Sequence, residues 1–354
     1  MVAQPILQEH LCWSSSAGGT AVENLLKTDR VASKVTSIET GKLYCYRRDS
    51  TSIGTVVSTL ATCPRLMRLV VNTWSGLEVV PSIPSPPIGT FPQLTTFYIG
   101  CGRYDGWIPL RTFCLILQLM PTLHTLTIGD IRNTSSDTIS DIPYPPCQLR
   151  SFAVSDARSV EFQSYDWLLH NSKNSLRQLH THYMSSHSTS TKSLLRVLPD
   201  LGSSLREFRC LGCWDQQLTL CVLQHCHKLE ALACCNSPNI LSGLASAACA
   251  KTLQRFTATQ VSLIEFPEPL DDGRYYFNSS RGLFMEVLSP RELVAMRRVV
   301  QRRVLPQLKE WKLQTVPFKR LINIHVVEVV ALKNECDKHG VVLDLARYDE
   351  VIKQ

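Results

Sequence analysis

Residues 205–211 read LREFRCL, and residues 229–235 read LEALACC. In the first stretch, Leu205, Phe208 and Cys210 stand at spacings of three and two, and the same pattern returns 24 residues later at Leu229. This is the L-x-x-L-x-L signature of a leucine-rich repeat, in which one short strand directs three apolar side chains into a shared core. The two stretches therefore predict a repeat fold.

The same unit recurs along most of the chain. Its first positions are residues 66, 94, 123, 149, 176, 205, 229, 253 and 308. Seven successive steps of 24 to 29 residues fit the period of this class. The final step of 55 residues indicates one degenerate or interrupted unit near residues 273–284. Segments of helical period are predicted between the strands, at 110–120, 165–171, 193–201, 217–226, 240–250, 285–304 and 323–336. Other predicted elements are helices at 21–26 and 52–63, strands at 35–38, 42–47 and 341–345, and a polar loop at 185–192. Gly340 is expected to end the last helix.

A strand, a turn and a helix in each unit generate a parallel sheet with helices outside it. We therefore predict an α/β leucine-rich-repeat solenoid, a horseshoe with the parallel sheet on its concave face. Residues 1–34 are expected to form an N-terminal cap, and residues 35–315 an array of about ten irregular units. Residues 316–354 are expected to form a C-terminal capping helix and strand.

Composition narrows the class of protein. A hydrophobic fraction of 44% with 19% charged residues is typical of a folded chain, and a net charge of +7 is too mild to indicate nucleic acid by itself. No apolar run approaches the ~18 residues of a membrane span, and residues 1–17 lack the pattern of a secretory signal. The 14 cysteines are therefore expected to be thiols in the cytoplasm or nucleus.

The repeat template predicts a binding face. Side chains alternate along a strand, so the third and fifth template positions face the open, concave side. The predicted contacts, chosen from a row that is polar and mixed in charge, are Arg68, Tyr98, Gln178, His180, Glu207, Arg209, Arg255 and Lys312. Such a row fits a protein or peptide partner, with Tyr98, Arg209 and Arg255 as anchors, better than nucleic acid or a membrane.

The cysteines near residues 210–235 admit two interpretations. Cys210 and Cys213 are spaced like metal ligands, so the cluster from Cys210 to Cys235 can be read as a zinc or redox site. The residues that follow them in this cluster are Cys221, His225, Cys226, His227, Cys234 and Cys235. The repeat register favours the alternative, because it places Cys210 and Cys234 at the inward sixth position, where cysteine acts as a small buried hydrophobe. We therefore expect no metal and no cofactor.

Sequence patterns for catalysis are not found. The chain contains no G-x-S-x-G, no phosphate-binding glycine loop and no H-E-x-x-H motif, so no catalytic residue is assigned and no enzymatic activity is expected. A basic segment carries Arg291, Arg297, Arg298, Arg302 and Arg303. It can bind nucleic acid or an acidic partner, or form a solvated outer helix face with its valines turned inward, and the second interpretation is favoured.

The units CPRLMRLVV, MPTLHTLTI, SLREFRCLGC and CHKLEALACC resemble the divergent leucine-rich repeats of fungal F-box-type proteins, whose horseshoes are similar to ribonuclease inhibitor. The resemblance implies a non-catalytic recognition scaffold that holds substrates of an SCF-type ubiquitin ligase. In that family an N-terminal F-box docks a Skp-type adaptor. Residues 1–50 contain no Leu-Pro-x-Glu-like helix start, so we expect adaptor binding only if an F-box lies upstream.

Overall fold

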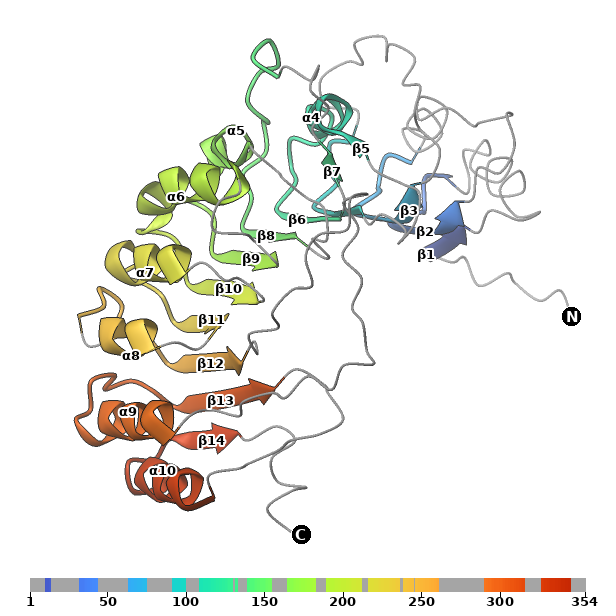
Figure 1. Cartoon of the computed structure of the whole chain (residues 1–354). Coiled ribbons are helices and arrows are strands. Elements are labelled where there is room, and N and C mark those ends of the chain that lie inside the picture. The colour runs from blue at the N-terminus through green and yellow to red at the C-terminus, as the bar shows by residue number, and fades with distance from the viewer. Residues whose placement is uncertain are drawn as a thin grey trace, which may run out of the picture. The chain divides into compact units, whose positions relative to one another are not determined.

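A computed structural model describes residues 10–13, 32–43, 63–74, 91–99, 108–129, 131–132, 139–154, 164–182, 189–211, 216–235, 238–244, 246–260, 290–315 and 326–344. The chain divides into two compact units, Met1–Leu205 and Arg206–Gln354. Within each unit, parallel strands follow one another across a sheet in chain order (Figure 1). Helices alternate with the strands throughout the second unit, and in the first unit the described helices lie between the later strands. The predicted α/β leucine-rich-repeat solenoid is therefore confirmed.

In the first unit the main sheet has the strand order β1-β2-β3-β4-β6-β8-β9, and β5 pairs with β7 in a separate sheet. The strands are β1 (His10–Trp13), β2 (Ser37–Leu43), β3 (Arg68–Trp74), β4 (Thr96–Ile99), β5 (Ile108–Pro109), β6 (Thr125–Ile128), β7 (Ile131–Arg132), β8 (Ser151–Val154) and β9 (Gln178–His182). The helices are α4 (Leu110–Leu117), α5 (Tyr165–Leu169), the 3-10 helix η1 (His170–Ser172) and α6 (Thr189–Leu201).

In the second unit the strand order is β10-β11-β12-β13-β14. The strands are β10 (Glu207–Leu211), β11 (Ala231–Cys235), β12 (Arg255–Gln260), β13 (Glu310–Thr315) and β14 (Val342–Asp344). The helices are α7 (Gln216–His225), α8 (Pro238–Leu244), α9 (Pro290–Gln301) and α10 (Val326–Lys338). All four helices lie on one side of these strands (Figure 1).

The strand register explains the repeat pattern. Phe208 pairs with Leu232, Leu232 with Phe256, and Phe256 with Trp311, so the fourth template positions form one lateral row. Three side chains of this row have no exposed surface: Phe208, Phe256 and Trp311. The rings of Phe256 and Trp311 pack edge to face, with their centroids 5.2 Å apart. Each such burial contributes about 1.5–3 kcal/mol. Alternation of inward apolar and outward polar residues therefore fixes both the sheet face and the register.

A shared backbone contact connects successive repeats. The carbonyl of the second template position accepts hydrogen bonds from two consecutive amides of the next repeat. The Arg150 carbonyl, for example, accepts from the amides of Arg177 at 2.8 Å and Gln178 at 3.0 Å. The Gln254 carbonyl likewise accepts from Lys309 at 2.8 Å and Glu310 at 3.1 Å. This contact satisfies the amides at the start of each strand and sets the register before the sheet ladder begins.

Hydroxyl side chains add a second connection between repeats. Thr122 Oγ1 donates to the Leu94 carbonyl at 3.1 Å, and Thr252 Oγ1 donates to the Leu229 carbonyl at 2.8 Å. Both threonines directly precede the first leucine of their own repeat, so a Ser or Thr at this position reaches back one full unit. In the opposite sense, the buried Ser172 Oγ accepts a hydrogen bond from the Leu149 amide at 2.8 Å.

Several predicted elements agree with the structure, and some bounds were wrong. The predicted strands at 35–38 and 42–47 share one strand, β2, of which residues 37–43 are described. Helix α6 begins at Thr189, so residues 189–192 are helical although the sequence favoured a polar loop there. Helix α8 ends at Leu244 rather than at residue 250. Residues 246–250 form turns instead, in which the Ala250 amide donates a hydrogen bond to the Ala247 carbonyl.

β12 pairs directly with β13 from Arg255–Glu310 to Gln260–Thr315, so no other strand of the sheet lies between them. Residues 273–284, where one degenerate or interrupted unit is predicted, lie outside the described residues. The predicted helices at 21–26 and 52–63 lie outside the described residues, apart from Cys63. The division into an N-terminal cap, an array and a C-terminal cap stays a prediction.

Candidate functional site

The third and fifth template positions form two registered rows on the strand face of the first unit. In the third-position row, Arg68 pairs with Thr96, followed across the sheet by Thr125, Ser151 and Gln178. In the fifth-position row, Val70 pairs with Tyr98, followed by Thr127, Ala153 and His180. The sequence prediction that these residues share one face is therefore confirmed by the register.

This part of the face is uncharged over several strands. Strands β4, β6 and β8 each alternate between a half-exposed third or fifth position and a buried fourth or sixth position. Arg68 and Gln178 are exposed, and Tyr98 and His180 are half-exposed. The surface offers hydroxyl, amide and phenol groups for hydrogen bonds, but it supplies no row of cations.

The corresponding rows of the second unit carry more charge. The third-position row contains Glu207, Ala231, Arg255, Glu310 and Val342, and the fifth-position row contains Arg209, Ala233, Thr257, Lys312 and Asp344. The two rows together hold three cationic and three anionic side chains. A partner of strong single charge therefore meets attraction and repulsion on the same surface, whereas a partner with mixed side chains can satisfy both.

Glu207 was predicted as an outward contact, and its placement differs from that expectation. Its side chain is only 11% exposed, and its Oε1 accepts from Arg209 Nε at 2.6 Å, while the Arg209 side chain stays 49% exposed. Glu207 is therefore a support that orients Arg209. Val70, Ala231 and Ala233 also occupy third or fifth template positions, yet all three are buried.

Lys312 is held by a residue that the repeat template did not identify. Lys312 Nζ donates to Asp344 Oδ2 at 2.5 Å across β13 and β14, and this hydrogen bond raises the pKa of Lys312 above its ordinary value. Sequence reasoning placed a strand at 341–345 but did not align it with the template. The alternation of Val341, Leu343 and Leu345 was the available signal, since it places Asp344 on the outward side.

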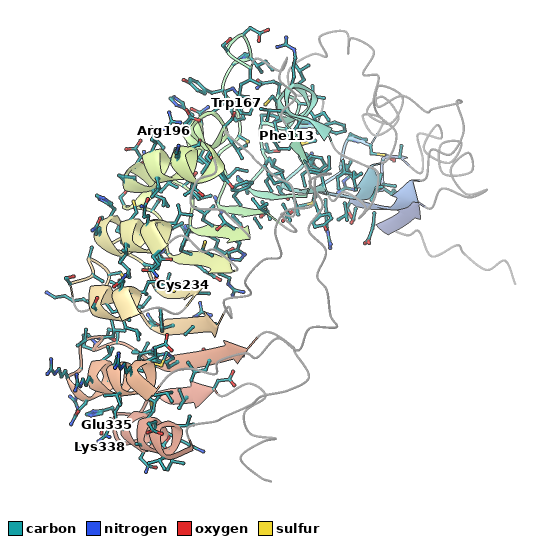
Figure 2. All side chains as sticks on the ribbon, viewed as in Figure 1. Phe113, Trp167, Arg196, Cys234, Glu335 and Lys338 are labelled. Carbon is teal, nitrogen blue, oxygen red and sulfur yellow. The ribbon has the colours of Figure 1, made fainter. Side chains whose placement is uncertain are left out.

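The cysteines are placed as the register interpretation predicted. Cys210, Cys226, Cys234 and Cys249 are fully buried, and Cys234 lies between its strand and the helices (Figure 2). Burial raises the pKa of the Cys226 thiol to about 12 and that of Cys249 to about 11. Such thiols hold little thiolate at neutral pH, and thiolate is the form that binds metals and reacts. Cys213 lies outside the described residues.

Within the part of the chain that the structure describes, no group of three His, Cys, Asp or Glu side chains could hold a metal ion. No helix of these residues is long and apolar enough to cross a membrane. His225 and His227, which the metal interpretation counts among its candidate ligands, are exposed, whereas Cys226 between them is buried.

No family model matches the chain, and no curated protein matches its sequence.

Proposed function

We propose that this protein is a non-catalytic recognition scaffold that binds a protein or peptide partner on the strand face. The observation that carries the proposal is the register of the repeats, which aligns solvent-facing side chains from consecutive strands into ordered rows. Such rows present side chains at a fixed spacing of about 4.8 Å between strands. A rigid surface of this kind binds with little loss of conformational freedom.

Three side chains are proposed as anchors. Tyr98 on β4 and Arg255 on β12 stand half-exposed and exposed, respectively, and Arg209 on β10 is exposed and oriented by Glu207. Tyrosine and arginine combine a large contact surface with directional hydrogen bonds, and they dominate the energetics of many protein interfaces. Truncating one of them is expected to weaken a complex by about 1–3 kcal/mol.

The finer proposal is that the partner is a substrate of an SCF-type ubiquitin ligase. It rests on the resemblance of the repeats to those of fungal F-box-type proteins and requires an F-box upstream. Co-precipitation of a Skp-type adaptor with the product of a full-length transcript would support the ligase role. A clean failure of that co-precipitation would reject the ligase role and leave the scaffold proposal in place.

Site-specific photo-crosslinking in cells tests the scaffold proposal. A crosslinking amino acid at Thr257, on the strand face, should give discrete protein adducts that the second substitution Arg255→Glu removes. The matched control is the same crosslinker at Gln217, which is exposed at the start of α7 on the helix side. Adducts that form only from Gln217, or that are unaffected by Arg255→Glu, would contradict binding at the strand face.

A further inference from the structure

The segment from Arg291 to Arg303 is the most strongly charged part of the outer helices, with five arginines and a single acidic residue, Glu292. The structure separates the five arginines into two groups by their contacts. Arg297 and Arg303 face α10, whereas Arg291, Arg298 and Arg302 face away from the protein core. The two groups therefore have different roles.

The first group attaches α9 to α10. Arg297 Nε lies 4.0 Å from Glu335 Oε2. Lys338 Nζ lies 3.8 Å from Oε1 of the same carboxylate (Figure 2). His339 Nε2 is 3.0 Å from Glu335 Oε1, and Arg303 Nε donates to His339 Nδ1 at 3.4 Å. A neutral His339 ring with its proton on Nε2 satisfies both contacts. These arginines are accounted for by packing within the protein.

The second group forms one stripe on α9. At 3.6 residues per turn, Arg291, Arg298 and Arg302 point within about 40° of one another. The Arg302 amide donates to the Arg298 carbonyl at 3.0 Å, which continues the helical geometry to the last member of the stripe. Opposite the stripe, the core-facing Leu293, Met296, Val299 and Val300 are buried. The sequence prediction that Val299 and Val300 turn inward is confirmed.

Local stability does not explain this stripe. Arg298 and Arg302 lie near the carboxyl end of α9, where the helix dipole favours cations, but Arg291 occupies the first turn, where the dipole opposes a cation. Arg298 and Arg302 are also one turn apart, a spacing at which like charges repel. All three arginines are exposed, and none makes an ion pair with another described residue. An anionic occupant would relieve the repulsion at each position.

We propose that the outer face of α9 is a second docking surface, which binds an acidic helical segment of a protein partner through Arg291, Arg298 and Arg302. The spacings of one turn and two turns match carboxylates on one face of a partner helix. Val294, which is 38% exposed beside the stripe, offers an apolar contact that a helix can cover. The stripe lacks the aromatic side chains on which nucleic-acid bases stack, and it lacks the large apolar residues with which a helix enters a membrane surface.

The proposal is tested by measuring the affinity of the full chain for two fluorescent alanine-based helical peptides. In one peptide three glutamates repeat the one-turn and two-turn spacings of the stripe, and in the other the same glutamates are distributed around the helix. The first peptide should bind several-fold more tightly at ~0.15 M salt. The triple variant Arg291→Gln/Arg298→Gln/Arg302→Gln should weaken its binding about tenfold.

A charge-matched control separates the stripe from the overall charge of the chain. The variant Lys228→Gln/Lys251→Gln/Lys309→Gln removes the same three positive charges from exposed positions outside α9, and it should weaken binding less than about threefold. Equal weakening by the two triple variants, equal affinity for the two peptides, or tighter binding of an RNA duplex than of the first peptide would each overturn the proposal. Arg255→Glu changes the strand face and should leave binding of the first peptide to α9 unchanged. The proposal for α9 and the proposal for the strand face are therefore tested independently.

Discussion

Arg303 and Gly340 occupy equivalent positions at the ends of α9 and α10. Replacing the arginine by glycine and the glycine by alanine should change stability in opposite directions. The Arg303 and Val304 amides donate to the Val300 and Val299 carbonyls at 2.9 and 3.1 Å. The Gly340 amide makes the corresponding bond to Asp337 at 3.1 Å, and the next amide completes the same pattern. This is the Schellman arrangement, in which the residue after the helix adopts left-handed backbone angles. The φ angles are 50° at Arg303 and 70° at Gly340.

The magnitude of the effect follows from the two side chains. A non-glycine residue in the left-handed region costs about 1–2 kcal/mol, which glycine avoids. Arg303→Gly removes this cost but loses the 3.4 Å contact with His339, an exposed hydrogen bond that contributes about 0.5 kcal/mol. We therefore expect a net stabilisation of about 0.5–1.5 kcal/mol. Gly340→Ala should destabilise by about 1 kcal/mol, and only through the backbone, because an added Cβ meets no atom within 4 Å.

Urea unfolding followed by tryptophan fluorescence and circular dichroism measures both variants. The variant Arg303→Ala is the control, since it removes the same His339 contact while keeping a side chain in the left-handed region. Arg303→Gly should exceed Arg303→Ala in stability by about 1 kcal/mol, or roughly 2–4 °C in Tm. If the two variants unfold together, or if Gly340→Ala is neutral, the assignment of left-handed strain at these helix ends is incorrect.

Two further perturbations address the core. Ser172→Ala should lower the free energy of unfolding in urea by about 1–3 kcal/mol, because it leaves the buried Leu149 amide without its acceptor. The control Ser246→Ala, at an exposed turn, should change stability by less than about 0.5 kcal/mol. Equal losses in the two variants would contradict the role of the buried hydrogen bond. In native-state alkylation at pH 8, followed by mass spectrometry, Cys226 should react far more slowly than the half-buried Cys221. The reason is that burial raises the pKa of the Cys226 thiol to about 12. The difference in rate should vanish in denaturant. Rapid native labelling of Cys226 would instead support the redox interpretation of the cysteine cluster.

The agreement between sequence and structure is best where one physical rule decides the outcome. The spacing of Leu205, Phe208 and Cys210 predicts the inward face of β10, because strand side chains alternate and only apolar residues are stable in the core. The same rule identified the buried Cys234 and the exposed Arg255. Gly340 ends α10 as expected, since glycine accepts the left-handed angles of a helix end at little cost.

The sequence alone was less informative where neighbours decide the environment of a side chain. Alternation placed Glu207 on the outward face, but its side chain is only 11% exposed and its carboxylate pairs with Arg209 at 2.6 Å. The 55-residue step predicts a degenerate or interrupted unit, and only the structure shows that β12 and β13 are direct neighbours in the sheet. Such contacts join residues that are distant in the chain, so no local spacing encodes them.

The sequence by itself determined the repeat unit, the inward rows of the core and the outward rows of the candidate face, because these follow from a period and from the alternation of side chains. The tertiary structure decided which outward side chains are available. It showed that Glu207 supports Arg209, that Asp344 holds Lys312, and that α10 engages only part of the arginine-rich helix. The physical reason is that periodicity fixes the direction of a side chain, whereas its charge environment depends on partners that only folding brings within reach.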